Sequence, residues 1–138
     1  MASIHKDIHL DAPASDVWDA VRDFGAVHRR LVPGFVLDCK PDGDVRLVAF
    51  ANGTTARELL VDCDEARRRL VYAVVSERVK QHSASVQVIE DGESTSRLIW
   101  TVDVLPHDVA PYIESQMELA AVAMRKAFAP TAAQPAPM

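Results

Sequence analysis

One arginine in this sequence has neighbours that suggest a binding role. Arg57, Leu59 and Val61 share one face of a strand predicted over 55–62, because side chains two residues apart point the same way. If that face is buried, the guanidinium needs a carboxylate, bound water or an anionic group of a ligand. Arg57 could instead reach solvent at the mouth of a cavity, or pair with an acidic side chain such as Glu58, Glu77 or Glu114.

A histidine in a later predicted strand is the second candidate. His82 shares a face with Ala84 and Val86, and an imidazole on the wall of a cavity can take up a proton. The alternative is a histidine of the core or its rim with no chemical role. Arg57 and His82 are thus the two catalytic candidates, and no second acid or base is spaced to cooperate with His82.

Other kinds of site are not indicated. The sequence has no nucleophile elbow and no phosphate-binding loop, and its histidines and cysteines lack zinc-type spacing. Cys39 and Cys63 lie alone in separate predicted strands and are expected to be reduced thiols. We therefore predict no metal and no cofactor.

Composition and charge exclude several partners. The chain has 138 residues and a net charge of −5, which argues against an electrostatic partnership with nucleic acid. No apolar run approaches the roughly 18 residues of a membrane span, and the N-terminus lacks a signal-peptide core. We expect a cytoplasmic protein, monomer or homodimer, with one domain over residues 1–130 and a disordered tail over 131–138, which is rich in Pro and Ala.

The hydrophobic periodicity changes along the chain and predicts an α+β fold. A strand over 3–10 gives way after Pro13 to a short helix and then a second one over 26–31. Six strands separated by short turns follow, predicted over 35–40, 45–50, 55–62, 69–76, 80–89 and 96–104. A long helix then runs from about Asp108 to Phe128.

The terminal helix has one apolar stripe at three- and four-residue spacing. Its members are Val109, Ile113, Met117, Ala120, Met124 and Phe128. Alanines crowd the second half of this helix. Such small residues either bring helix and sheet into close contact or leave room for a ligand, and the spacing alone is compatible with both.

Three segments together resemble the helix-grip fold of the START-related superfamily. These are Asp-Ala-Pro-Ala-Ser-Asp-Val-Trp at 11–18, Arg-Arg-Leu-Val-Tyr at 68–72 and Trp-Thr-Val-Asp-Val at 100–104. The superfamily includes polyketide cyclase and dehydratase-like proteins, the birch pollen allergen group and the plant abscisic acid receptors. The resemblance spans about residues 3–128 and implies a curved sheet of about seven strands with a cavity between sheet and terminal helix.

The resemblance also implies which faces line that cavity. An alignment by eye with the abscisic acid receptors places Leu59 and Val61 inside, and with them Arg57. It places Val71, Ala73 and Val75 inside as well. The receptors' gate corresponds to residues 50–54, a shorter turn without proline, so hormone-receptor function is not implied.

We therefore predict a protein that binds a small hydrophobic or aromatic molecule, acidic and polyketide-like or lipid-like if Arg57 faces inward. One alternative is a polyketide cyclase/dehydratase-type enzyme using the same cavity without a cofactor. Another is a co-chaperone-like or dimerising module, which would need an exposed apolar patch. The predicted ligand-binding residues are Arg57, Leu59, Val61, Ala73, Val75, His82, Ala84, Val86, Trp100, Ile113, Met117, Ala120 and Met124.

Overall fold

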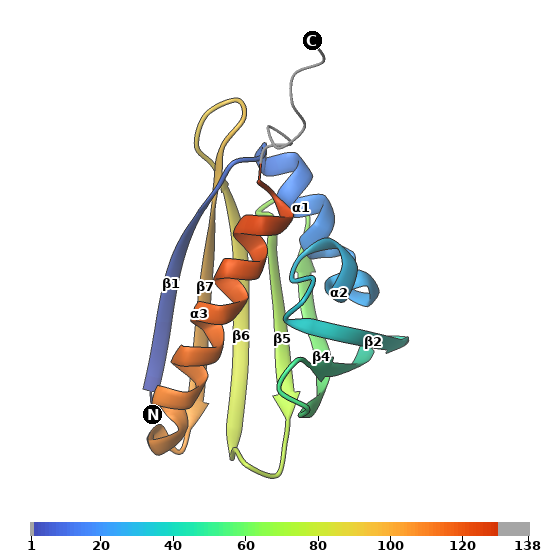
Figure 1. The fold of residues 1–138 in the computed structure, drawn as a ribbon, viewed down its shortest axis with the longest axis vertical. Coiled ribbons are helices and arrows are strands. Elements are labelled where there is room, and N and C mark those ends of the chain that lie inside the picture. Colours follow the sequence, from blue (N-terminus) through green and yellow to red (C-terminus); the bar gives the residue numbers. More distant parts are fainter. Residues whose placement is uncertain (1, 130–138) are drawn as a thin grey trace.

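A curved antiparallel sheet holds a long helix against its concave face in the computed structural model, which describes residues 2–129 (Figure 1). The seven strands are β1 (Ala2–Leu10), β2 (Val36–Asp42), β3 (Val45–Phe50), β4 (Thr55–Asp64), β5 (Arg69–Val75), β6 (Gln81–Glu90) and β7 (Ser96–Leu105). The helices are α1 (Ala14–Arg22), η1 (Phe24–Ala26), α2 (Val27–Arg30), η2 (His107–Val109) and α3 (Ala110–Ala127).

The strand order is β1-β7-β6-β5-β4-β3-β2, so the first strand pairs with the last and the other six form a meander. This confirms the predicted helix-grip architecture. The tail predicted over 131–138 lies outside the described residues, and the single domain over 1–130 stays a prediction.

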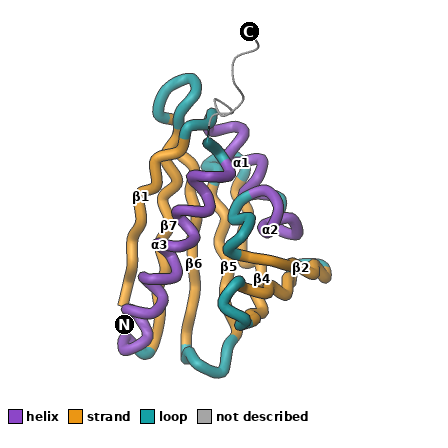
Figure 2. The backbone as a smooth tube through the Cα atoms, viewed as in Figure 1, coloured by secondary structure: helices purple, strands orange, loops and turns teal. Residues whose placement is uncertain are grey.

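The short helices close one end of the sheet, as Figure 2 shows. Pro13 ends the first extended segment, and α1 begins at the next residue. Its apolar side, with Val17, Trp18 and Val21, is buried in the core. The indole Nε1 of Trp18 donates to Glu65 Oε1 at 2.8 Å, which ties α1 to the β4–β5 turn.

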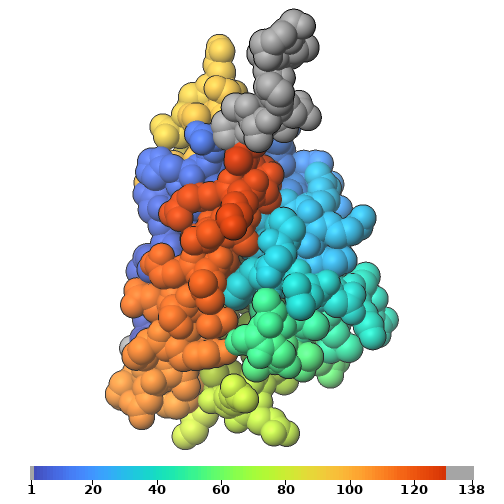
Figure 3. Space-filling model, viewed as in Figure 1, coloured from blue at the N-terminus to red at the C-terminus, as the bar shows by residue number. Residues whose placement is uncertain are grey.

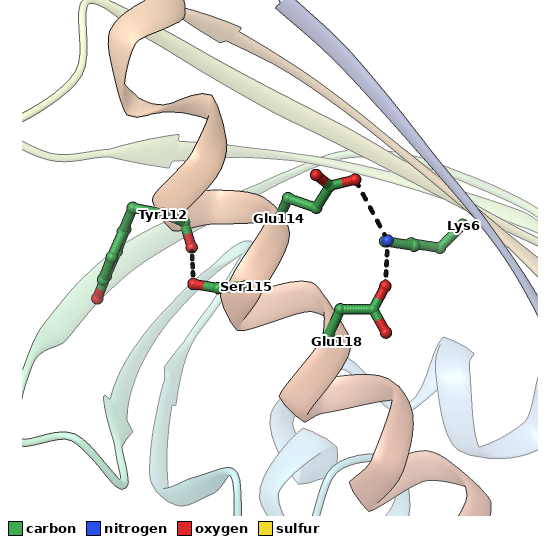
Figure 4. A network of polar contacts seen from close by, with 5 residues as sticks. All are labelled: Lys6, Tyr112, Glu114, Ser115 and Glu118. Atoms are coloured by element: carbon green, nitrogen blue, oxygen red, sulfur yellow. Dashed lines mark hydrogen bonds and ion pairs between the residues drawn. The ribbon is translucent and has the colours of Figure 1, made fainter.

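The terminal helix crosses the concave face and is attached to the edge strand β1. Lys6 of β1 forms ion pairs with Glu118 and, at 3.4 Å, with Glu114, one turn apart on α3 (Figure 4). These acceptors raise the pKa of Lys6, and the lysine lowers the pKa of Glu118. The Ser115 hydroxyl donates to the Tyr112 carbonyl at 2.7 Å on the other side of α3.

Candidate functional site

A cavity of about 720 Å³ lies between the concave face of the sheet, α3 and the segment that contains α2. This volume is in the range typical of small-molecule sites. Its inner wall is apolar and includes Val21, Val27, Leu31, Val32, Val36, Val48, Leu70, Val86, Val102, Met117, Ala120 and Met124. The cavity is therefore a space that the core leaves unfilled.

The opening of the cavity lies where three loops meet near the start of α3. Exposed residues of the wall come from the β3–β4 turn (Gly53), the β5–β6 loop (Arg78) and η2 (Asp108). The β3–β4 turn is fastened to α3, because Asn52 Nδ2 donates to the Tyr112 hydroxyl at 2.9 Å. The space-filling view shows α3 in orange against the cyan and green segments (Figure 3). All three contribute residues to the wall of the cavity.

Seven of the predicted ligand-binding residues lie in the wall of the cavity. They are His82, Val86, Trp100, Ile113, Met117, Ala120 and Met124. The apolar stripe of the terminal helix and the alternation of β6 and β7 thus point to this space. Whether these residues bind a ligand stays a prediction.

The prediction that Arg57 faces the cavity is wrong. Arg57 is exposed and pairs across the strands with Leu47 and Val75, which are 51% and 54% exposed on the outer, convex face. Arg57 therefore does not contribute to the wall of the cavity, and the structural reason for expecting an acidic ligand disappears.

Four further predicted residues do not line the cavity because they share that outer face. Leu59 pairs with Ala73, Val75 pairs with Arg57, and Val61 is 61% exposed at a bulge in β4. Strand β5 is apolar on both faces, so its alternation did not distinguish inside from outside. In β4 the face with Leu59 and Val61 is the more apolar one, so its alternation predicted the wrong side. The sixth misplaced residue, Ala84, is buried on the concave face between Tyr72 and Val102 but does not reach the cavity.

The inward polar groups of these strands are ones that the sequence reasoning missed. Arg46 of β3 and Glu58 of β4 are directly opposite each other, are 6% and 7% exposed, and both line the cavity. A signal was present in the sequence. The Asn52-Gly53 turn sets the β3–β4 register, and that register places these opposite charges across from each other.

Each of the three nitrogens of the Arg46 guanidinium contacts an acceptor within the protein. Its Nε and Nη2 each lie 2.8 Å from Oε1 of Glu58, and its Nη1 donates to the Phe24 carbonyl at 3.0 Å. Its carbon Cζ lies 3.9 Å from the centre of the Phe24 ring and 5.2 Å from that of Tyr72. The positive charge of Arg46 is therefore already balanced by Glu58 within the protein.

Two more polar groups complete this part of the wall. Burial, and secondarily the charge of Glu58, raises the pKa of the Tyr72 hydroxyl, so it is neutral at physiological pH. The nearby indole N–H of Trp100 has the smaller effect of lowering the Tyr72 pKa. The indole nitrogen itself is buried and has no hydrogen-bond partner among residues 2–129. Arg46, Glu58, Tyr72 and Trp100 therefore form one polar cluster in an otherwise apolar wall, and we call it the polar cluster below.

A family model described as "Polyketide cyclase / dehydrase and lipid transport" matches residues 1–134. The chain belongs to this family. No curated protein matches the sequence. None of the helices in residues 2–129 has the length and hydropathy of a transmembrane segment.

Solved structures show the same helix-grip fold as this member of the polyketide cyclase/dehydrase family. The protein XoxI from Bacillus cereus has 22% identity and a TM-score of 0.82, covering 93% of this chain and 96% of its own. A START superfamily protein from Mycobacterium smegmatis has 14% identity and a TM-score of 0.74, covering 91% and 96%. Norcoclaurine synthase from Thalictrum flavum has 19% identity and a TM-score of 0.69, covering 91% of both chains.

His82 is a titratable residue in the wall of the cavity. Burial lowers its pKa, so the imidazole is neutral at physiological pH and has a lone pair available as a base. Its backbone pairs with Val104, and Ala84, the next residue on the same face of β6, pairs with Tyr72 of the polar cluster. Within residues 2–129 no group of three or more His, Cys, Asp or Glu side chains is placed so that it could hold a metal ion.

Proposed function

We propose that this protein binds one small, neutral, largely apolar molecule in the cavity between the sheet and α3. The observation that carries the proposal is an apolar space of about 720 Å³ next to α3. Because buried apolar area drives association, an aromatic or polycyclic ligand would gain most from filling it.

The neutrality of the ligand follows from the charges of the wall. Arg46 is balanced by Glu58 and hydrogen-bonded to Phe24, and Arg57 lies on the outer face. Arg78 lies at the opening of the cavity rather than in its inner wall. Desolvating a carboxylate against the inner wall, where Arg46 is already paired, would therefore be unfavourable. A polyketide-like or lipid-like molecule would therefore bind in an uncharged form.

A matched pair of dyes tests the proposal. N-phenyl-1-naphthylamine is neutral and fluoresces more strongly in apolar surroundings, and 8-anilinonaphthalene-1-sulfonate is its sulfonated analogue. We expect saturable one-to-one binding of the neutral dye and weaker binding of the sulfonate. Failure of the neutral dye to bind the folded protein would contradict the proposal. Separately, native mass spectrometry of protein purified from cells would detect a retained natural ligand.

A cyclase or dehydratase reaction in the same cavity is the second candidate, favoured by the neutral imidazole of His82 in the wall. Such an enzyme would use His82 as the base and the Tyr72 hydroxyl to donate to a developing enolate. Its test is a cyclisation assay on an aromatic polyketide surrogate. Loss of turnover in His82→Ala with retained dye binding would favour the enzyme over a binding protein.

A further inference from the structure

We infer that the carboxylate of Glu58 accepts a hydrogen bond from a hydroxyl group of the ligand, so that the cavity selects neutral hydroxylated aromatic molecules over their ethers and acids. This inference rests on the proposed binding function and adds a chemical class to it.

The first observation is that Glu58 uses one of its two carboxylate oxygens. Both contacts of Arg46 reach Oε1, at 2.8 Å each, and no hydrogen bond within residues 2–129 reaches Oε2. A carboxylate has about four acceptor positions, so Oε2 can accept a hydrogen bond from a group inside the cavity. Since Glu58 is 7% exposed and lines the cavity, a ligand is positioned to supply the missing donor.

The second observation concerns what Glu58 would select. The charge of Arg46 is balanced by Glu58, and each of its three nitrogens already contacts an acceptor. Oε2 is an acceptor only, so it attracts an O–H and repels the oxygens of a carboxylate or an ether. A carboxylate ligand would place a second negative charge beside Glu58, and the one positive charge of Arg46 already balances the first.

The third observation is the position of Tyr72 in the same wall. The centre of its ring lies 5.2 Å from Cζ of Arg46, the partner of Glu58, and Tyr72 and Glu58 both line the cavity. Burial raises the pKa of its hydroxyl and keeps it protonated. A ligand hydroxyl held between them can donate to Oε2 of Glu58 and accept from Tyr72. An alcohol or phenol makes both hydrogen bonds, whereas an ether makes only the second.

Three naphthalenes of nearly equal shape test the inference by displacement of N-phenyl-1-naphthylamine from the wild-type protein. They are 2-naphthol, 2-methoxynaphthalene and 2-naphthoate. We expect 2-naphthol to bind about tenfold or more tightly than the other two, the scale of one hydrogen bond to a charged group. Equal affinity of 2-naphthol and 2-methoxynaphthalene would overturn the inference while leaving the proposed function intact; failure of the dye itself would overturn the function.

The variant Glu58→Gln sharpens this test. Its amide oxygen is needed by Arg46, so its NH₂ group takes the place of Oε2 and turns an acceptor into a donor. The preference for 2-naphthol should fall at least about fivefold, and 2-naphthoate should gain affinity. Glu93→Gln, an exposed glutamate in the β6–β7 turn, is the matched control and should change neither. An unchanged preference in Glu58→Gln would overturn the inference, and if this variant does not fold, the wild-type ratio decides.

Discussion

At the residue scale, the ion pair of Arg46 and Glu58 joins two strands and also holds η1 through the Phe24 carbonyl. Arg46→Met should lower the free energy of unfolding by about 3–5 kcal/mol, because a buried carboxylate is left without its partner. The double variant Arg46→Met/Glu58→Leu should regain much of this loss. Urea denaturation measures both, and a double variant less stable than the single one would contradict this account of the pair.

A second prediction at this scale concerns His82 and the pH dependence of the unfolding free energy. Its pKa in the folded protein is below the ordinary 6.5, so the unfolded chain takes up the proton more readily. The stability linked to His82 is fully present above about pH 6.5 and is lost as the pH falls from there through the lower folded pKa. His82→Gln should therefore reduce the decline in unfolding free energy between about pH 7 and about pH 5. His9→Gln, outside the cavity, serves as the control, and an identical decline in His82→Gln and wild type would count against a buried neutral imidazole.

At the element scale, two buried alanines distinguish the cavity from the packed core. Ala120 of α3 lines the cavity, whereas Ala84 of β6 is enclosed by its neighbours and does not. Ala120→Phe should weaken binding of the neutral dye with little loss of stability, because its ring enters empty space. Ala84→Phe should cost about 1–3 kcal/mol of unfolding free energy by overpacking. Dye titration and urea denaturation of both variants check this, and equal destabilisation by the two would mean that the space beside Ala120 is not available.

At the scale of the whole molecule, a ligand that binds only the folded state should stabilise all the elements around the cavity together. At a ligand concentration one hundred times the dissociation constant, the gain is about 2.7 kcal/mol. For a domain of this size that corresponds to a rise in melting temperature on the order of 10 °C. Calorimetry with 2-naphthol should show this rise for wild type and little of it for Ala120→Phe, and a rise of equal size in both would place the ligand elsewhere.

The convex face is a separate feature at this scale. Leu47, Val61 and Val75 are each more than half exposed there. This is the kind of apolar surface that an interaction module would need. The oligomeric state, predicted as monomer or homodimer, stays a prediction.

The sequence by itself determined the order of the elements and two walls of the cavity. The change from strand to helix at Pro13 and the five turns between the six later strands follow from local backbone preferences. The stripe with Met117 and Ala120 on α3, and the alternation that includes Val86 on β6, needed no knowledge of neighbours. Each of these elements has one clearly apolar face, so its inward side can be read from its own residues.

Only the tertiary structure decided the inward side of β4 and β5. Leu59 and Leu60 are both apolar and point to opposite faces, so the direction of Arg57 depends on which face of the sheet curves around α3. The β3–β4 turn sets the register that pairs Arg46 with Glu58, but the turn alone does not decide which face of the sheet this pair occupies. Curvature is set by contacts between distant segments, and for that reason the polar cluster became visible only in the folded protein.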